Sequence, residues 1–366
     1  MQFSVKQVSD SKKWEAFVRH FSPNNFLQSW AFGQFNKADG DEMLPLGVFD
    51  GENQVAAALF IKIMAKRGNY YACAAGPLVQ FKIQNSKFKI SESNADAGGD
   101  EFDREYYAQI IQALVGYLKQ QDKGMDFIRI RPTLVQSEDN QALFESLGFR
   151  PAPMHLHAER SWVLDLSPTE DDLLKNMRKN TRYYVNRAPK DGVSVRISQD
   201  LADVDILYDL QQETVSRQHF VAFSRQYFQE LFKAFRPADQ VAMFVADYQG
   251  KPLAAAMINY YGDMAVYHYA ASSSENRKIP GAYAILWEAI KEAKRRGCKY
   301  FNFWGVVGED EKNHPWHGLS QFKRGFGGQE VWYLHAQDYP LNWKYPLIRW
   351  FAVSYTHLTL PTKRIV

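Results

Sequence analysis

The strongest constraint on the fold of this chain is the order of its secondary-structure signals, because the same order occurs in both halves. The first half contains the hairpin pattern VFDGENQVAAALF and the second half contains ADYQGKPLAAAMI, each with two apolar runs joined by a short polar turn. In each half a further strand signal, an amphipathic helix signal and another strand signal follow the hairpin. We therefore predict an α/β (α+β) protein built from two domains of similar construction.

The boundary between the halves is expected at PAPMHLHAERS (151–161), where prolines and polar residues interrupt both patterns. A chain of 366 residues with 46% apolar and 23% charged residues has enough apolar side chains for two ordinary cores. The last residues, SYTHLTLPTKRIV (354–366), end an amphipathic pattern and have neither helical nor strand periodicity. We expect these residues to be a non-native tail.

The cysteines and the charge narrow the class of protein. Cys73 and Cys298 lie far apart and in no CxxC arrangement, so neither a disulfide framework nor a structural zinc site is predicted. The N-terminal segment lacks the apolar run of a signal peptide, and no stretch reaches the roughly 18 apolar residues of a membrane span. These features favour a cytoplasmic location. A net charge of +3 is too small to indicate a nucleic-acid-binding protein by itself, so local charge patterns matter more.

Phe322 and Lys323 lie in HGLSQFKRGFGG, directly after the strand signal KYFNFWGVV. A helical turn at this point can carry both side chains into a cleft, and the glycines that follow allow close backbone approach or positive φ. The alternative is a solvated lysine on a short surface helix with a glycine C-cap. The spacing alone favours this alternative.

A helix is expected from about Asp171 to Lys190, with basic side chains largely opposite its apolar face. No acidic residue four positions on neutralises these side chains, which are Lys175, Arg178, Lys179 and Arg182. They form either a solvated face or a stripe that contacts the phosphates of RNA or of a pyrophosphate-linked ligand.

An aromatic strand signal contains Tyr267 and Tyr269, which strict alternation would place on one face of a sheet. With Arg225 and Tyr227 from the preceding helix they could line one pocket, although core packing explains a tyrosine pair more often. Neighbouring histidines, His155 and His157, resemble a metal-binding couple only superficially. No third ligand stands near them in the sequence, so we predict no metal site there.

Several enzyme classes lack support in the sequence. It has no GxSxG, HExxH, Walker or dinucleotide motif, which argues against serine hydrolases, zinc proteases, NTPases and dehydrogenases. The nearest candidate for a pyrophosphate loop, RKIPGAYAI, is interrupted by Pro280, which weakens simple coenzyme A chemistry. We therefore predict no cofactor.

Several segments together resemble the FemABX family of peptidoglycan-bridge aminoacyltransferases: FLQSWAFGQF, GPLV, MRKNTRYYVNRAPKDGVSV, YHYAAS and GLSQFKRGFGG. The resemblance covers nearly the whole chain and is to short, FemX-like members without a coiled-coil arm. It implies two tandem GNAT-like acyltransferase domains around a shared cleft. The first would comprise residues 1–155 with a return at about 329–353, and the second residues 156–328.

The same resemblance implies the reactants and the site residues. The donor would be aminoacyl-tRNA carrying Gly, Ala or Ser, and the acceptor a stem-peptide amine of a lipid-linked or UDP-linked peptidoglycan precursor. Phe322 and Lys323 match the pair beside the reacting ester, with Lys323 stabilising the oxyanion. The basic helix would contact tRNA. The precursor would be bound by Lys37, Arg225, Tyr227, Tyr267 and Tyr269.

The sequence departs from the family pattern at three places. Arg131 stands where some members have an aspartate before proline, so the group that removes the proton from the attacking amine is unidentified. The position of the precursor-binding lysine falls on Asn36 or its neighbour Lys37. The position of an arginine before Tyr227 is taken by Phe223, with Arg225 close by.

Other functions stay open at this point. One alternative is a noncatalytic tRNA- or precursor-binding protein, and another is a coenzyme-A-dependent N-acyltransferase acting on a small amine. The basic and aromatic segment NWKYPLIRWF either contacts the inner membrane surface or docks against the core.

Overall fold

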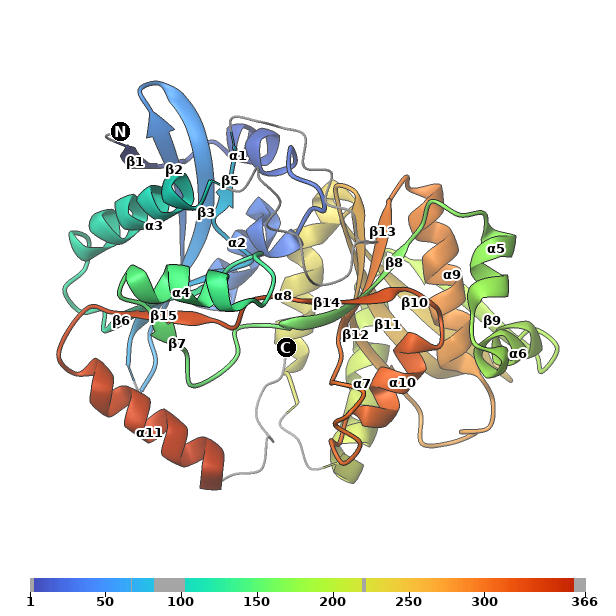
Figure 1. Cartoon of the computed structure of the whole chain (residues 1–366). Helices are drawn as coiled ribbons and strands as arrows, with labels where there is room; N and C mark the ends of the chain where they lie inside the picture. The colour runs from blue at the N-terminus through green and yellow to red at the C-terminus, as the bar shows by residue number, and fades with distance from the viewer. Residues whose placement is uncertain (1–2, 67, 82–102, 219–221, 359–366) are drawn as a thin grey trace. The chain divides into compact units, whose positions relative to one another are not determined.

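The computed structural model of the chain describes residues 3–66, 68–81, 103–218 and 222–358 (Figure 1). The contacts between residues divide the chain into two units. The first contains Met1–Glu159 and the segment that begins at Trp332, and the second contains Arg160–Val331. Each unit has its own sheet and its own apolar core.

The first unit is built on a mixed sheet with the strand order β1-β2-β3-β4-β6-β15-β7, and the short β5 pairs with β3. Only β4 and β6 in this order are parallel neighbours. Its strands are β1 (Ser4–Gln7), β2 (Glu42–Asp50), β3 (Asn53–Ile63), β4 (Tyr70–Ala74), β5 (Leu78–Val79), β6 (Phe127–Arg131), β7 (Arg150–Pro151) and β15 (Gln337–Pro340). Its helices are α1 (Ser11–Val18), α2 (Trp30–Ala38), α3 (Arg104–Lys119), α4 (Glu138–Ser146) and α11 (Tyr345–Leu358), with a 3₁₀ turn at Phe26–Gln28.

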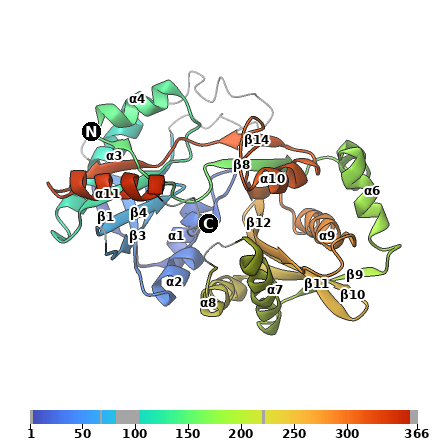
Figure 2. The same ribbon diagram turned by 90° about the horizontal axis from the view of Figure 1, so that it is seen from below.

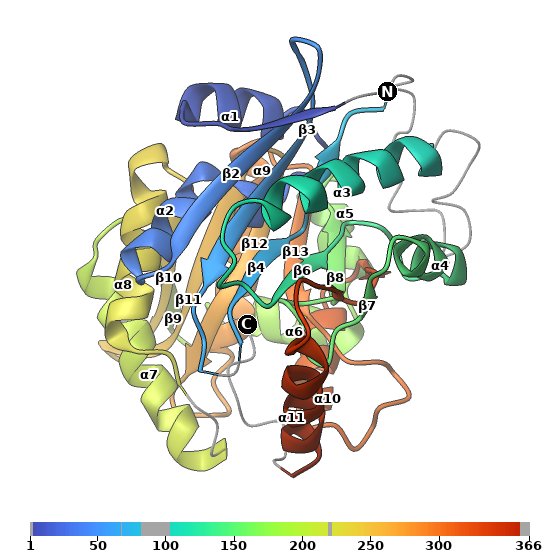
Figure 3. The same ribbon diagram turned by 90° about the vertical axis from the view of Figure 1, so that its left-hand side faces the viewer.

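Helix α3 covers one face of this sheet, as Figure 3 shows. The side chain of Asp103 caps the helix by accepting a hydrogen bond from the Tyr106 N–H at 2.8 Å. Apolar side chains at helical spacing on α3, among them Ile110 and Leu114, then pack on alternate residues of β3 such as Phe60. Consecutive residues in the middle of β2 and β3 are buried, because α1 and α2 pack on the opposite face of these strands.

The second unit has the strand order β14-β8-β13-β12-β11-β10-β9, in which β12 and β13 are parallel. Its strands are β8 (Arg160–Asp165), β9 (Val193–Ser198), β10 (Val241–Tyr248), β11 (Lys251–Tyr261), β12 (Met264–Ser272), β13 (Tyr300–Gly305) and β14 (Gln329–Trp332). Its helices are α5 (Glu170–Asn176), α6 (Lys179–Arg187), α7 (Ala202–Gln218), α8 (Arg225–Phe235), α9 (Gly281–Arg295) and α10 (His317–Arg324), with a 3₁₀ turn at Arg236–Ala238.

Helices cover both faces of the second sheet. Figure 2 shows α9 on one side of the sheet and α7 with α8 on the other. The core on the α9 side takes alternate residues of β11 and β12, including Ile258 and Ala265, together with Val185 of α6. The two hairpins that the sequence indicates are β2–β3 and β10–β11, and both are antiparallel.

The C-terminal helix extends further than its sequence pattern suggests. We expected the amphipathic pattern to stop at residue 354, but α11 continues through Leu358, and residues beyond it lie outside the described part of the chain. Among the described residues, no helix is both long enough and apolar enough to span a membrane.

Candidate active site

The parallel strands β12 and β13 diverge before they end. They pair at Met264↔Tyr300, Ala265↔Phe301 and Val266↔Asn302. Beyond this ladder, β12 has a β-bulge against β11, because Tyr267 pairs with Ile258 and Tyr269 pairs with Met257, which leaves His268 as the extra residue. The pairing of β13 with β8 also shifts register between Asn302 and Gly305.

Trp304 marks the point of divergence on β13. Its φ of 68° is unusual for a bulky residue, and such strained residues concentrate at functional sites. The Trp304 N–H donates a hydrogen bond to Oδ1 of Asn302 at 2.7 Å, which stabilises this conformation. The Trp304 ring lies 5.2 Å from the ring of His268, centroid to centroid. The bulge and the strained residue thus meet where the two strands diverge.

Lys323 reaches this place from α10. Its Nζ donates a hydrogen bond to the carbonyl oxygen of Gly305, the last residue of β13, at 2.6 Å. The residue is only 5% exposed, and burial lowers the pKa of its amine to about 7. The interpretation that spacing alone favoured, a solvated surface lysine, is therefore wrong. A buried amine with this pKa is present in both its neutral and its protonated form near pH 7.

The residues on either side of Lys323 anchor α10. The Phe322 ring packs edge-on against Tyr283 of α9, with centroids 4.8 Å apart, and also contacts Phe326. Arg324 is 2% exposed and donates to the carbonyl oxygen of Val307 at 2.6 Å. Phe322, expected beside the reacting ester, therefore holds the helix on its aromatic side while Lys323 points to Gly305.

Two glycines after α10 make the return of the chain possible. Gly327 and Gly328 have φ of 87° and 100°, and a Cβ on Gly328 would lie 2.5 Å from the carbonyl oxygen of Val163 in β8. The expected positive φ is confirmed at both positions, and the expected close backbone approach is confirmed at Gly328.

The basic segment is two helices, not the single helix predicted. Met177 and Arg178 have extended backbone between α5 and α6. The reason is tertiary: Met177 is buried at 3% exposure, and the Arg178 N–H donates to the carbonyl oxygen of Gly325 at 2.9 Å. This contact overrides the helical preference of the local sequence.

The break brings part of the basic segment to α10. Arg178 donates to the side-chain oxygen of Gln321 at 2.6 Å, so its guanidinium lies on the helix that carries Lys323. Arg182 donates to the carbonyl oxygen of Lys175 at 2.7 Å, while Lys179 is exposed. Lys175 lies 3.7 Å from Asp172, an acidic partner three positions earlier in the chain.

The predicted tyrosine cluster is only partly assembled. The hydroxyls of Tyr227 and Tyr269 lie 2.9 Å apart. Tyr267 instead packs into the core on the α9 side of the sheet, so the expectation that Tyr267 and Tyr269 share a face is wrong. The bulge at His268 is the cause, because one extra residue turns the following side chains to the other face.

Arg225 does not point into a cluster with these tyrosines. Its guanidinium forms ion pairs of 2.9 Å with both Asp205 and Asp209 of α7 and stacks over the ring of Tyr208. These contacts assign it to joining α7 and α8.

Comparison with known proteins identifies the family. The model of the FemAB family matches residues 10–251 and 239–351. The chain belongs to the FemAB family. It is similar to the aminoacyltransferase FemB of Staphylococcus epidermidis, with 23% identity over 387 residues, which covers 86% of this chain and 90% of the relative. It is also 20% identical over 306 residues to the lipid II:glycine glycyltransferase of the same species, covering 64% of this chain and 73% of that protein.

Solved structures agree on the fold. The crystal structure of FemX matches with a TM-score of 0.78 at 16% identity, covering 96% of this chain and all of the other. A tandem GNAT protein from the clavulanic acid pathway matches with a TM-score of 0.51 at 11% identity, covering 93% and 98%. The expected family and the tandem GNAT-like α/β fold are both confirmed.

Two residues in the first unit of this FemAB-family chain stand where the sequence departs from the family pattern. Lys37 is exposed on α2 and lines a surface cavity of about 480 Å³ together with Trp30 and Asp41. Arg131 is the last residue of β6 and is 1% exposed over the ring of Tyr333. Its Nε and Nη1 have no hydrogen-bond partner among the described residues, and burial lowers its pKa.

Sequence reasoning missed Trp304 and Asn302 in the candidate active site. Both lie in the quoted strand signal KYFNFWGVV, but alternation gives no indication of a register shift or of a positive φ at tryptophan. The glycine that follows Trp304 was the one local signal of an irregularity in this strand.

Proposed function

We propose that this FemAB-family chain transfers glycine, alanine or serine from aminoacyl-tRNA to a stem-peptide amine of a peptidoglycan precursor. The observation that carries the proposal is the buried Lys323 amine at the end of β13, beyond the point where β13 diverges from β12. The names of the relatives, aminoacyltransferase and lipid II:glycine glycyltransferase, support the reaction class and the type of acceptor.

The lowered pKa of Lys323 suggests which group removes the proton from the attacking amine. An acceptor amine of the lysine type has a pKa of about 10.4, so about one molecule in a thousand is neutral at pH 7. Arg131 cannot accept its proton, because a guanidinium stays protonated. Neutral Lys323, with a pKa of about 7, can do so and act as the general base.

Protonation of Lys323 also assists the attack on the ester. After Lys323 has taken it, the neutral amine attacks the ester carbonyl, and the new ammonium of Lys323 stabilises the oxyanion of the tetrahedral intermediate. The C–O bond to the tRNA ribose breaks, and the ribose oxygen takes a proton from the former amine nitrogen. An amide and a ribose hydroxyl result, and Lys323 returns its proton to solvent.

The contacts around Lys323 suggest where each reactant binds. Arg178, which donates to Gln321 of α10, and the exposed Lys179 next to it suit the phosphates near the 3′ end of tRNA. On the other side, the Tyr227–Tyr269 pair continues through His268 to Trp304, with His268 and Tyr269 ring centroids 4.1 Å apart. This line of aromatic side chains suits the peptide of the acceptor.

An apolar surface at the start of α11 supports a lipid-linked acceptor. Its side chains, each more than half exposed, are Trp343, Leu347, Trp350 and Phe351. They recur at helical spacing next to Lys344 and Arg349, a combination typical of helices that lie in the membrane interface. Exposure of these side chains argues against docking on the core. The protein should therefore co-sediment with phosphatidylglycerol vesicles, and the double variant W343A/W350A should remain in the supernatant.

The transfer assay uses purified protein with radiolabelled glycyl-, alanyl- or seryl-tRNA and lipid-linked or UDP-linked muropeptide in parallel. We expect transfer by the wild type, loss with Lys323→Met, and no change with Lys312→Met, which removes an exposed lysine of the same unit. Tight tRNA binding without transfer to either acceptor would show a noncatalytic binding protein. Thermal stabilisation by coenzyme A and transfer without tRNA would show the alternative N-acyltransferase.

A further inference from the structure

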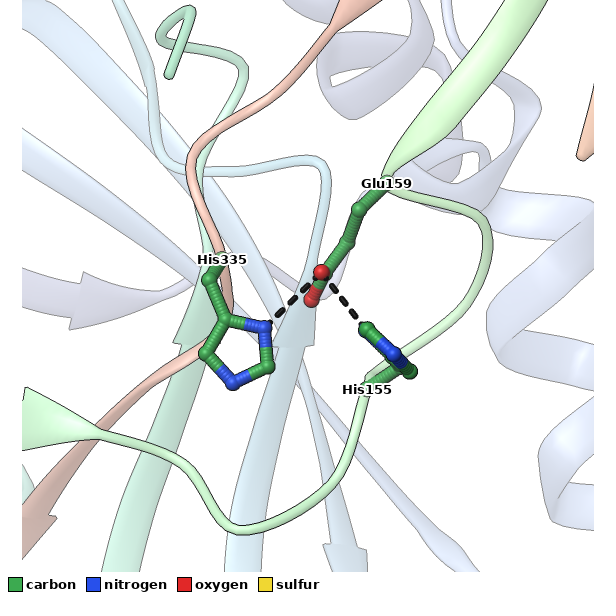
Figure 4. A group of neighbouring side chains, drawn as sticks. All are labelled: His155, Glu159 and His335. Carbon is green, nitrogen blue, oxygen red and sulfur yellow. Dashed lines mark hydrogen bonds and ion pairs between the residues drawn. The ribbon is translucent and has the colours of Figure 1, made fainter. Parts of the chain in front are cut away.

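Two neighbouring side chains, His155 and Glu159, converge with the distant His335 in the first unit, at the points where the chain leaves this unit and returns to it (Figure 4). Nδ1 of His155 lies 2.6 Å from Oε2 of Glu159, and Nδ1 of His335 lies 2.8 Å from the same oxygen. The three donor atoms all lie within 4.8 Å of one another. The group takes His155 from the histidine couple considered in the sequence but not His157, and His335 adds a donor atom from a distant part of the chain.

The backbone fixes which atoms face the centre of this group. Nε2 of His335 lies 2.8 Å from the carbonyl oxygen of Ala152, so this nitrogen carries a hydrogen and donates it. In the neutral ring Nδ1 then has the free lone pair. The Ala336 N–H donates to Oε1 of Glu159 at 2.9 Å, which leaves Oε2 for the group. Hydrogen bonds of this kind orient histidine and carboxylate ligands in metal sites.

Charge and access also suit a cation. The side chain of Glu159 is 6% exposed, and a buried carboxylate needs a positive partner. In the absence of a cation, both imidazoles must direct an Nδ1–H at one oxygen, which requires His335 to be doubly protonated because its Nε2–H is already used. One divalent ion replaces both of these protons. The side chain of His155 is 76% exposed, so an ion can enter from solvent and keep bound water.

We propose that Nδ1 of His155, Nδ1 of His335 and Oε2 of Glu159 bind one divalent transition-metal ion of the zinc type. Two histidines and one glutamate are a donor set that zinc uses, with water in the remaining position. Tetrahedral metal–ligand bonds of about 2.0–2.2 Å place ligand atoms about 3.3–3.6 Å apart, so the two nitrogen–oxygen separations would widen by about 0.5–1 Å. The ion links residues 155–159, where the chain leaves the first unit, to residue 335, just after the chain returns to it. This site is separate from the reaction assigned to Lys323.

The test is metal binding by tag-free protein that has been treated with a chelator and then dialysed. Zn²⁺ is titrated calorimetrically at pH 7.5, and Co²⁺ is followed by its visible absorption, which reports ligand number. We expect one equivalent of each ion to bind to the wild type. His155→Ala, which truncates an exposed side chain, should weaken binding at least tenfold. His20→Ala, an exposed histidine of the same unit, should leave it unchanged.

Circular dichroism and the melting temperature confirm that each variant is folded before titration. Saturable binding that His155→Ala leaves unchanged would overturn the proposal, because the ion would then lie elsewhere. Absence of saturable binding to the wild type at micromolar Zn²⁺ and Co²⁺ would also overturn it, and would show that the three residues form only a histidine–glutamate ion pair.

Discussion

The two units end their parallel strand pairs in different ways. In the first unit, β4 and β6 pair from Tyr70↔Phe127 to Ala74↔Arg131, which are the last residues of both strands. In the second, the ladder stops at Val266↔Asn302, although β12 continues to Ser272 and β13 to Gly305. The first two strands stay paired to their last residues, which we call the closed end. The second two separate before their last residues, which we call the open end.

Each strand end is accompanied by a buried cation, but the two cations differ in chemistry. Arg131 is delocalised, lies over the Tyr333 ring and remains protonated at any working pH, even though burial lowers its pKa. Lys323 has a localised amine whose pKa burial lowers to about 7. Only the open end therefore has a cation that can exchange a proton, which suggests that the two units divide structural and chemical roles.

The largest effect that this comparison predicts is on catalysis. Lys323→Met should reduce kcat in the transfer assay by about 10²- to 10³-fold, because it removes both the base and the charge beside the oxyanion. Its melting temperature should be unchanged or higher, since a buried amine is replaced by an apolar side chain. Arg131→Met should change kcat by less than about threefold. Equal losses in both variants would mean that the two ends do not differ in function.

The second prediction concerns the glycine turn that holds α10 at the open end. Gly328→Ala should lower the free energy of unfolding by about 3–4 kcal/mol, because a Cβ there meets the Val163 backbone at 2.5 Å in addition to the cost of positive φ. Gly192→Ala is the matched control: its φ is 86° and nothing lies within 4 Å of an added Cβ, so about 1–2 kcal/mol is expected. Urea unfolding of both variants measures the difference, and equal values would show that the turn tolerates a side chain.

Local signals were sufficient for much of the fold. The hairpins β2–β3 and β10–β11 combine apolar runs with short polar turns, and α3 and α9 carry apolar residues at helical spacing. These patterns depend on neighbours in the sequence, so they can be read without knowing the tertiary contacts.

The candidate site was harder to predict because tertiary contacts decide it. The bulge at His268 separates Tyr267 from Tyr269, although strict alternation would keep them together. The predicted basic helix is interrupted because the Arg178 N–H donates a hydrogen bond to the Gly325 carbonyl oxygen. Burial of Lys323, which lowers the pKa of its amine to about 7, depends on contact with β13 and cannot be predicted from the residues next to it in the sequence.

A smaller effect is expected from loosening the open end itself. Asn302→Ala removes the oxygen that accepts the Trp304 N–H at 2.7 Å, so the strained backbone before Gly305 should relax and displace the carbonyl that holds Lys323. We expect kcat to fall about tenfold, the equivalent of about 1.4 kcal/mol, with KM for the acceptor little changed. Asn302→Asp keeps the acceptor oxygen and should retain most of the activity. If both substitutions are silent, the geometry at Trp304 does not control Lys323.

The smallest effect is a pH dependence of stability that only the open end should show. Lys323 has a pKa of about 7 in the folded protein, below the ordinary value of 10.5 that it regains on unfolding. Between these two values the unfolded chain binds more protons, so the free energy of unfolding should rise with pH, by at most about 1.4 kcal/mol per unit. Below pH 7 both states are protonated, and this contribution no longer changes with pH.

Urea unfolding at pH 7 and pH 8 should therefore give a larger increase in the free energy of unfolding for the wild type than for Lys323→Met. Arg131→Met should behave like the wild type, because a guanidinium does not titrate in this range. Parallel pH profiles for the wild type and Lys323→Met would show that Lys323 keeps an ordinary pKa, and the general-base step assigned to it would then be lost.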